Sequence, residues 1–304
     1  MLEFRTLQLS DREWVQTALD KSGFWGCEYS FANNLAWRRA ADTKYARLDD
    51  FYICASFDTD DKIPDFYYPS GEGDLKKVFS EMADTAHSMN VPLRIIGVTD
   101  RTMPLLRSLY GDSFEAQPYP DGFDYIYETK DLIELPGKKY HQKRGHLAQF
   151  RKTYANYSFS VMTPDDYDEC IAMSARFYNE KHGYTDRSSV AEQFAIHTYF
   201  SHFDELMLKG GVLRVEGKLA GFSIGERLTD DMFITHIEKA DINYKGVYTA
   251  LMQAFTAEFA AGYRYINREE DLGIEGLRRA KRACRPVFML EKYSCTFPET
   301  KILL

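Results

Sequence analysis

Three consecutive acids, Glu269, Glu270 and Asp271, follow a short β-like run at residues 263–267. A partly buried carboxylate has its pKa raised toward neutrality and can then act as a general base toward an attacking amine. The cluster also suits a structural role, because a helix dipole favours acids at its N-terminus, where Glu270 or Asp271 can cap the following helix. Both interpretations remain open from these residues alone.

An acid–lysine pair, Glu238 and Lys239, ends the last of three β-like runs within residues 211–240. Turn signals between these runs predict a three-stranded meander. Ligands of α/β sheets usually bind beyond the carboxyl ends of the strands, so Glu238 is a candidate general base. The alternative is a structural salt bridge from Glu238 to Lys245 or Lys281.

A glycine turn, N-Y-K-G-V-Y at residues 243–248, leads from the meander into an apolar helix ending near Gly262. The free amides of a helix N-terminus attract anions such as phosphate. The turn loosely fits the Q/R-x-x-G-x-G/A pattern by which Gcn5-related acyltransferases bind coenzyme A pyrophosphate. The alternative is that Gly246 only lets the chain turn tightly. The predicted cofactor-binding residues are Ala240, Tyr244, Lys245, Gly246, Val247, Tyr248 and Asn267.

The helix expected after the acidic cluster carries many basic residues. Arg278, Lys281 and Arg285 share one side, where they could meet a phosphate, a carboxylate or Asp271. A charge run of this kind is more often a solvated helix face. Lys281, with Tyr293 on the final β-like run, is a candidate to stabilise a leaving group.

A basic segment lies between the two halves of the chain. Residues 135–157 contain six lysines and arginines and no acid. Leu147, Phe150 and Tyr154 recur at helical spacing, which predicts a basic helix over residues 139–155.

The two halves share an order of elements. Residues 211–297 predict a meander followed by helix, strand, helix and strand, with the final strand at 286–297. Residues 50–128 repeat the later part of this order, with a glycine-led helix at 70–90 whose nearby acids favour a simple turn. We therefore predict two modules, residues 1–136 and 137–304, of which the first is degenerate.

Composition sets wider limits. The 304 residues carry a net charge of -8, which argues against a whole-surface attraction to nucleic acid or anionic membrane. Five scattered cysteines form no C-x-x-C pair, so we expect reduced thiols and no metal site. No apolar stretch approaches membrane-spanning length and no signal region opens the chain, so the cytoplasm is the expected location.

The most specific motifs are HIEKADINYKGVY at residues 236–248 and YINREEDLGIEGLRRAKRACRP at 265–286. With residues 124–150 and DDFYICASF at 49–57, they resemble the DUF2156 family, which is similar to the C-terminal catalytic domain of phosphatidylglycerol lysyltransferase. The resemblance implies an α/β fold of two Gcn5-related N-acyltransferase modules in tandem, each a mixed central sheet flanked by helices, as in Fem-type transferases.

The resemblance also implies a functional cleft in the second module. The strand–turn–helix order and the acidic surface favour a coenzyme A thioester as the donor, whereas the resemblance and the basic helix favour the alternative, aminoacyl-tRNA; the acceptor would be an amine or a hydroxyl. A non-catalytic protein that binds a metabolite on the same fold is the competing hypothesis. The predicted catalytic residues are Glu238, Asp271, Lys281 and Tyr293, and the predicted substrate-binding residues are Lys143, Arg144, Lys239 and Glu269.

Overall fold

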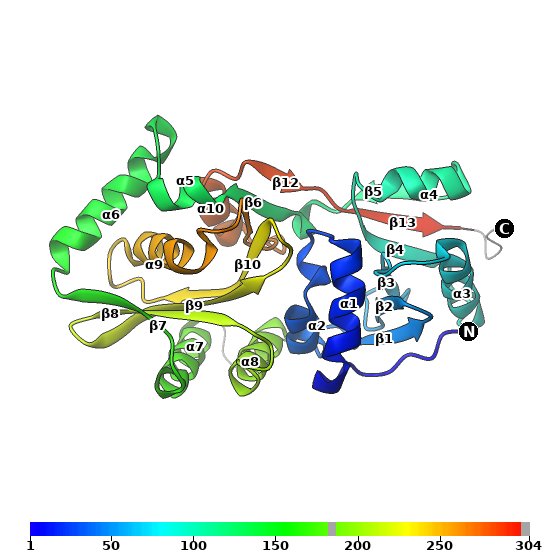
Figure 1. Cartoon of the computed structure of the whole chain (residues 1–304), viewed down its shortest axis with the longest axis horizontal. Coiled ribbons are helices and arrows are strands. Elements are labelled where there is room, and N and C mark those ends of the chain that lie inside the picture. Colours follow the sequence, from blue (N-terminus) through cyan, green and yellow to red (C-terminus); the bar gives the residue numbers. More distant parts are fainter. Residues whose placement is uncertain (182–186, 299–304) are drawn as a thin grey trace. The chain divides into compact units, whose positions relative to one another are not determined.

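The computed structural model describes residues 1–181 and 187–298, which form two compact units (Figure 1). Unit 1 comprises Met1–Phe123 and the chain from Leu290 onward, and unit 2 comprises Asp124–Met289. Each unit has its own mixed sheet flanked by helices, as the resemblance implied.

Unit 1 is built on a six-stranded sheet in which β3 and β4 are parallel neighbours. Its glycine-led segment serves as a turn, because Asp74 Oδ1 caps the next helix by accepting a hydrogen bond from Lys77 N at 3.2 Å. The strand order is β1 (Thr43–Leu48), β2 (Phe51–Ser56), β3 (Asp65–Tyr67), β4 (Leu93–Val98), β13 (Tyr293–Phe297) and β5 (Glu115–Pro118). The helices include α1 (Arg12–Ser22), α2 (Phe31–Trp37), α3 (Leu75–Ser88) and α4 (Met103–Tyr110).

Unit 2 contains a seven-stranded sheet in which β10 and β11 are parallel neighbours. The predicted meander is confirmed as β8, β9 and β10, joined by antiparallel ladders. The strand order is β12 (Phe288–Leu290), β6 (Asp124–Glu128), β11 (Tyr265–Asn267), β10 (Met232–Ala240), β9 (Lys218–Arg227), β8 (Lys209–Val215) and β7 (Tyr157–Val161).

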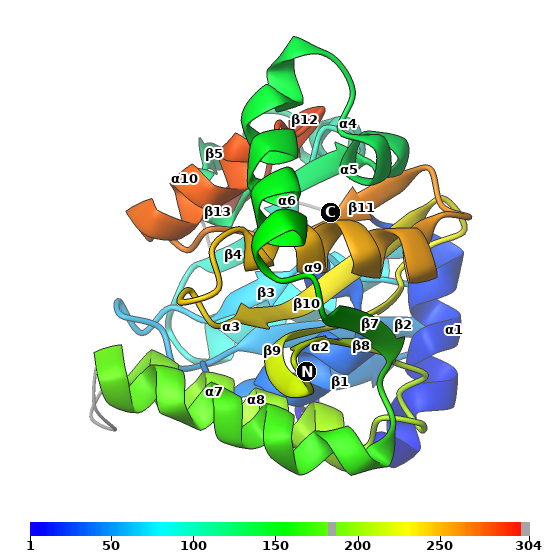
Figure 2. The same cartoon turned by 90° about the vertical axis from the view of Figure 1, so that its left-hand side faces the viewer.

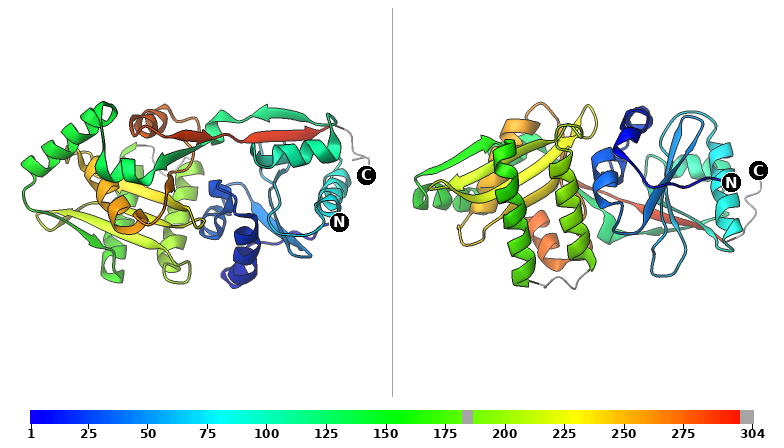
Figure 3. Two further views of the ribbon diagram at one scale, coloured as in Figure 1. Left: turned by 45° about the horizontal axis from the view of Figure 1, so that its top comes forward. Right: turned by 90° about the horizontal axis from the view of Figure 1, so that it is seen from below.

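Helices cover both faces of the unit 2 sheet, as Figures 2 and 3 show. One face carries α7 (Tyr167–Lys181) and α8 (Arg187–Ser201). The other carries α5 (Thr129–Glu134), α6 (His141–Thr153) and α9 (Val247–Phe255). The core beneath α6 and α9 includes the buried side chains Phe150, Phe233, Leu251 and Phe255.

Two strands change places relative to the predicted modules. Strand β6, expected in the first module, pairs with β11 in unit 2. The single strand predicted over 286–297 is wrong: it is divided into β12, in the unit 2 sheet, and β13, which pairs with β4 and β5 in unit 1. The reason is burial, because Cys295 and Phe297 belong to the apolar core of unit 1. The contact boundary therefore differs from the predicted one at 136.

Candidate active site at the ends of β10 and β11

The parallel pairing of β10 and β11 stops at Ile234 and Asn267, whereas β10 continues to Ala240. The chain after Asn267 leaves the ladder and forms a loop over residues 268–274 before α10 (Glu275–Ala283). Polar side chains of this loop and of the last residues of β10 therefore meet at one edge of the unit 2 sheet.

Glu238 is held by an ion pair. Its Oε1 atom lies 2.8 Å from Nη2 of Arg268, and each side chain is about one-seventh exposed. The Arg268 guanidinium also stands over the Tyr127 ring and donates to Met252 Sδ at 3.5 Å. A salt bridge at Glu238 was an open alternative, but Arg268 takes the place of the lysines proposed as its partner.

Asp271 is buried and fully hydrogen-bonded. Its oxygens accept from Tyr125 Oη at 2.6 Å, from Gly273 N at 2.9 Å and from two Arg278 nitrogens at 2.9 Å each. The bidentate Arg278 contact, opposed by burial, lowers the Asp271 pKa to about 2. A carboxylate with so low a pKa is a weak base at neutral pH, and its contacts hold the turn before α10.

Lys281 fastens the same loop from α10. Its Nζ donates to the carbonyl oxygen of Arg268 at 2.6 Å and to that of Glu270. Burial lowers the Lys281 pKa, against the pull of nearby acids. These contacts give Lys281 a positioning role in the loop.

Glu269 takes part in a buried charge cluster that the sequence analysis missed. His236 Nδ1 lies 2.8 Å from Glu269 Oε1, and His236 Nε2 lies 3.1 Å from Glu226 Oε1. Burial alone lowers the His236 pKa, but the hydrogen bonds to Glu226 and Glu269 outweigh it and raise the pKa to about 9. The ring stacks on Tyr199 of α8, with 5.3 Å between centroids.

The pairing of Glu226 with His236 depends on the register between β9 and β10, which the sequence does not show. Glu226 lies on β9 opposite Ile234 of β10, and a register shift between Thr235 and Ile237 brings His236 to it. His236 stands in the HIEK motif, so the motif pointed to the right strand. Glu226, its partner on β9, lies in none of the motifs that the sequence analysis singled out.

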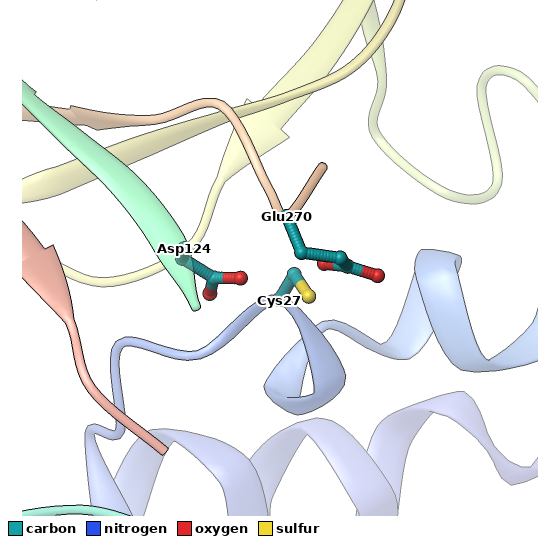
Figure 4. Close-up of side chains that lie close together, drawn as sticks. All are labelled: Cys27, Asp124 and Glu270. Atoms are coloured by element: carbon teal, nitrogen blue, oxygen red, sulfur yellow. The ribbon is translucent and has the colours of Figure 1, made fainter. Parts of the chain in front are cut away.

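Asn267 is buried and structural in its contacts. Its Nδ2 donates to Asp124 Oδ2 at 2.8 Å, and its Oδ1 accepts from Glu269 N at 2.6 Å. Figure 4 shows Asp124 at the start of β6 and Glu270 in the loop after β11. The amide of Asn267 thus joins β6 to the acidic loop.

The glycine turn before α9 packs against α6. Gly246 has φ of +88°, and a Cβ there would stand 2.4 Å from the His146 carbonyl oxygen. Lys245 N donates to Tyr154 Oη, and Val247 N donates to Tyr244 O, each at 3.1 Å. Glycine is required at position 246 because of the left-handed turn and the close packing of α6 against it. The amides of Lys245 and Val247, which could have bound a phosphate, already have hydrogen-bond partners within the protein.

The other predicted cofactor-binding residues surround this turn. Ala240 is buried at the end of β10, and Tyr244 packs edge-on against Tyr154 with 5.3 Å between ring centroids. Tyr248, in the first turn of α9, is 39% exposed.

The predicted substrate-binding cations have different environments. Arg144 Nη1 donates to the carbonyl oxygens of Leu135 and Gly137, which gives it a structural task at the end of α5. Lys143, its neighbour on α6, is half-buried. Lys239 Nζ lies 2.8 Å from Glu192 Oε1 on α8.

Tyr293 belongs to another sheet than the remaining candidates. It lies on β13 of unit 1, and its Oη donates to Glu291 Oε2 at 3.0 Å. That hydrogen bond raises the Tyr293 pKa. The tyrosine is therefore not among the groups that unit 2 gathers at β10 and β11.

Comparison with known proteins defines the class. Residues 20–296 match the family model described as "Phosphatidylglycerol lysyltransferase, C-terminal". The chain belongs to this family, and that membership supports aminoacyl transfer as the general class of reaction. The predicted family resemblance is confirmed.

Individual relatives extend the comparison. A conserved protein of unknown function from Bacteroides thetaiotaomicron is 33% identical, with a TM-score of 0.89 over 98% of this chain and 100% of that one. L-PGS from Bacillus licheniformis is 15% identical, with a TM-score of 0.65 over 96% and 93% of the two chains. An uncharacterized protein of Mycoplasmoides gallisepticum is 23% identical over 56% of this chain. The match spans about half the length of that curated relative, 54%.

FemX shares the fold at a TM-score of 0.58 and 8% identity, over 96% of this chain and 97% of that one. At such low identity the similarity shows only the fold, and this shared fold agrees with the tandem acyltransferase architecture. Among the described helices, none combines the length and the apolar character needed to cross a bilayer.

Proposed function

We propose that unit 2 transfers an aminoacyl group from an aminoacyl-tRNA to an amine or a hydroxyl. The observation that carries the proposal is the braced polar edge at β10 and β11, where Glu238, Arg268 and Asp271 are fixed by ion pairs. Rigidly held charges of this kind suit a reaction in which charge develops on a carbonyl and a leaving oxygen.

Glu238 is the proposed general base. Arg268 contacts its Oε1 atom, whereas both oxygens of Asp271 are engaged by Arg278 and other donors. Glu238 would take the proton of the attacking amine or hydroxyl as the new bond to the carbonyl carbon forms. The ester bond to the ribose then breaks, and the proton passes to the ribose oxygen.

The turn before α9 favours aminoacyl-tRNA over coenzyme A as the donor. Coenzyme A would need the amides of this turn for its pyrophosphate, but Lys245 N and Val247 N are bonded within the protein and α6 fills the space beside Gly246. A coenzyme A thioester remains the second candidate, because the strand–turn–helix order itself is that of a phosphate site.

The basic helix α6 favours a polynucleotide donor. Lys138, in the turn just before α6, and Lys152, in its last turn, are exposed, and Lys143 lies between them. Each lysine that contacts a phosphate releases counterions, and such binding weakens as the salt concentration rises, because ions released into a saltier solution gain less entropy. The chain as a whole carries a net charge of -8, which repels a polyanion. The basic helix α6 would therefore direct the tRNA to one region of the surface.

The binding step can be tested with Lys143→Ala/Lys152→Ala in a filter assay with aminoacyl-tRNA. We expect affinity to fall at least tenfold at low salt, with a shallower salt slope. The matched control is Lys130→Ala, a change of another exposed lysine in unit 2. Equal affinity of the double variant and the parent would contradict a tRNA donor bound through α6.

The competing hypothesis is a protein that binds a metabolite without catalysis. Glu238→Gln should abolish transfer while the circular dichroism spectrum is retained, whereas Glu258→Gln, at an exposed position, should leave transfer unchanged. Binding of donor without turnover by the parent protein would favour the non-catalytic alternative.

A further inference from the structure

A thiol, an ammonium group and a carboxylate meet in unit 1, in residues that the proposed reaction does not use. Lys292 Nζ donates to Glu28 Oε2 at 2.6 Å and to Cys27 Sγ at 3.6 Å. The Cys27 thiol donates to the same carboxylate oxygen at 3.7 Å. Cys27 is a free cysteine, and it and Lys292 are each 6% exposed. The three side chains, here called the Cys27 triad, thus form a closed and buried set of hydrogen bonds.

The backbone fixes both sides of the triad. The thiol and the carboxylate stand on η2 (Cys27–Tyr29), where two carbonyl oxygens accept from the side chains of Asn33 and Asn34 at 3.1 and 2.9 Å. On the other side, the carbonyl oxygen of Lys292 accepts from Tyr119 N at 2.9 Å. The sulfur and the nitrogen are therefore held close together by two anchored segments that are far apart in the sequence.

The carboxylate of the triad occupies space beside a glycine. Gly97 of β4 has φ of +69°, and a Cβ there would stand 2.8 Å from Glu28 Oε1. Burying a lysine–carboxylate pair costs desolvation free energy, and apolar side chains often stabilise a core as well or better. Stability alone therefore gives little reason to place these charges beside a thiol.

The triad distinguishes Cys27 from other thiols of unit 1. Glu28 can take the thiol proton, and the Lys292 ammonium group stabilises the thiolate that remains, which is the nucleophilic form of cysteine. By contrast, burial raises the pKa of Cys54 and that of Cys295 to about 12, so these two remain protonated thiols. We expect an oxidant to react with Cys27 before it reacts with either of them.

We propose that a peroxide joins Cys27 to Lys292 through a covalent sulfur–nitrogen bond. In the first step the sulfur attacks a peroxide oxygen and the O–O bond breaks, which gives a sulfenic acid and one water. In the second step Glu28 takes a proton from the Lys292 ammonium group, and the freed amine attacks the sulfenic sulfur. The S–O bond breaks, and its hydroxyl leaves as water with a further proton from the nitrogen.

The two steps balance. A thiol, an ammonium group, a carboxylate and hydrogen peroxide give a sulfenamide, a carboxylic acid and two waters. The sulfur is oxidised by two electrons, and the peroxide is reduced by two. Burial directs the second step to the lysine, because bulky external thiols are kept away while Lys292 Nζ already lies 3.6 Å from the sulfur.

The cross-link would close a loop between residues 27 and 292, which is most of the chain. Such a bond restricts the unfolded state and so stabilises the fold. This proposal concerns a modification of unit 1, and it stands whether or not the transfer reaction is the one proposed above.

The test is mass spectrometry of the full chain after treatment with hydrogen peroxide and proteolysis without a reductant. We expect a linked pair of peptides that contains Cys27 and Lys292 and is lighter than the two separate peptides by two hydrogen atoms. Dithiothreitol should cleave the link. The cross-linked protein should melt about 5 °C or more above the reduced protein.

Lys292→Arg keeps a cation beside Glu28 but removes the nucleophilic amine. It should form no link and should leave about tenfold more sulfenic acid for a dimedone probe. The matched control is Cys54→Ser, which removes another buried thiol of unit 1 and should form the link as the parent does.

Three results would overturn the proposal. In the first, Cys27 of the parent is oxidised without a bond to Lys292. In the second, all five cysteines are oxidised at equal rates. In the third, Cys27 stays reduced at a peroxide concentration that oxidises Met207, a methionine that is 63% exposed.

Discussion

The Oε1 atom of Glu238 lies 2.8 Å from Nη2 of Arg268, so an ion pair joins the end of β10 to the loop after β11. Both side chains are largely shielded from solvent. The parallel ladder between these strands has already ended at Asn267, and this pair continues the connection beyond it. The proposed base is thereby fixed at the edge where the acidic loop begins.

Breaking this pair should be costly. Arg268→Met leaves the carboxylate of Glu238 shielded and unpaired, and we expect it to lower the free energy of unfolding by about 3–5 kcal/mol in urea denaturation. The double variant Arg268→Met/Glu238→Leu should recover most of this loss. A double variant as unstable as the single one would show that the pair is not coupled.

His236 should make stability depend on alkaline pH. Its pKa is about 9 in the fold against an ordinary 6.5, so its contribution is fully present below pH 6.5 and is lost as pH rises through 9. A shift of this size corresponds to about 3 kcal/mol. Urea denaturation between pH 6 and pH 10 should show this decline for the parent and a flatter profile for His236→Gln. Parallel profiles would contradict a charged His236 between Glu226 and Glu269.

Gly246 should tolerate no side chain. Gly246→Ala places a Cβ 2.4 Å from the His146 carbonyl oxygen in a left-handed turn, so α6 and α9 must separate. We expect a loss of about 2 kcal/mol or more in unfolding free energy. Gly262→Ala is the matched control, because nothing lies within 4 Å of its Cβ and its φ is not positive. Equal stability of the two variants would contradict the packing role of Gly246.

Asp271 should govern the order of the loop before α10. Asp271→Asn weakens the bidentate contact with Arg278, and we expect a loss of about 1–3 kcal/mol in unfolding free energy. Amides of residues 268–274 should then exchange hydrogen faster, while those of β9 keep their rates. Unchanged exchange in the loop would show that Lys281 holds it alone.

The sequence predicted the meander, α9 and α10 because each has a clear period or turn signal, and it predicted a polar edge after β10 and β11. It could not predict the exchange of β6 and β13 between the units, since strand partners are chosen by long-range burial rather than by local pattern. The sequence predicted Lys245 or Lys281 as the salt-bridge partner of Glu238, whereas the partner is Arg268, which follows the end of the neighbouring strand β11. His236 likewise reaches Glu226 where the register between β9 and β10 shifts, between Thr235 and Ile237, and no local pattern predicts such a shift.

The central claim, aminoacyl transfer, is tested most directly by single-turnover release of labelled amino acid from a mixture of aminoacyl-tRNAs. Enzyme in excess is mixed with a panel of amine and hydroxyl acceptors, lipids included, beside a parallel reaction with acetyl-coenzyme A. We predict that labelled amino acid moves from tRNA to an acceptor with the parent protein and not with Glu238→Gln, while acetyl-coenzyme A is not consumed. Consumption of acetyl-coenzyme A with the tRNA esters left intact would contradict the account.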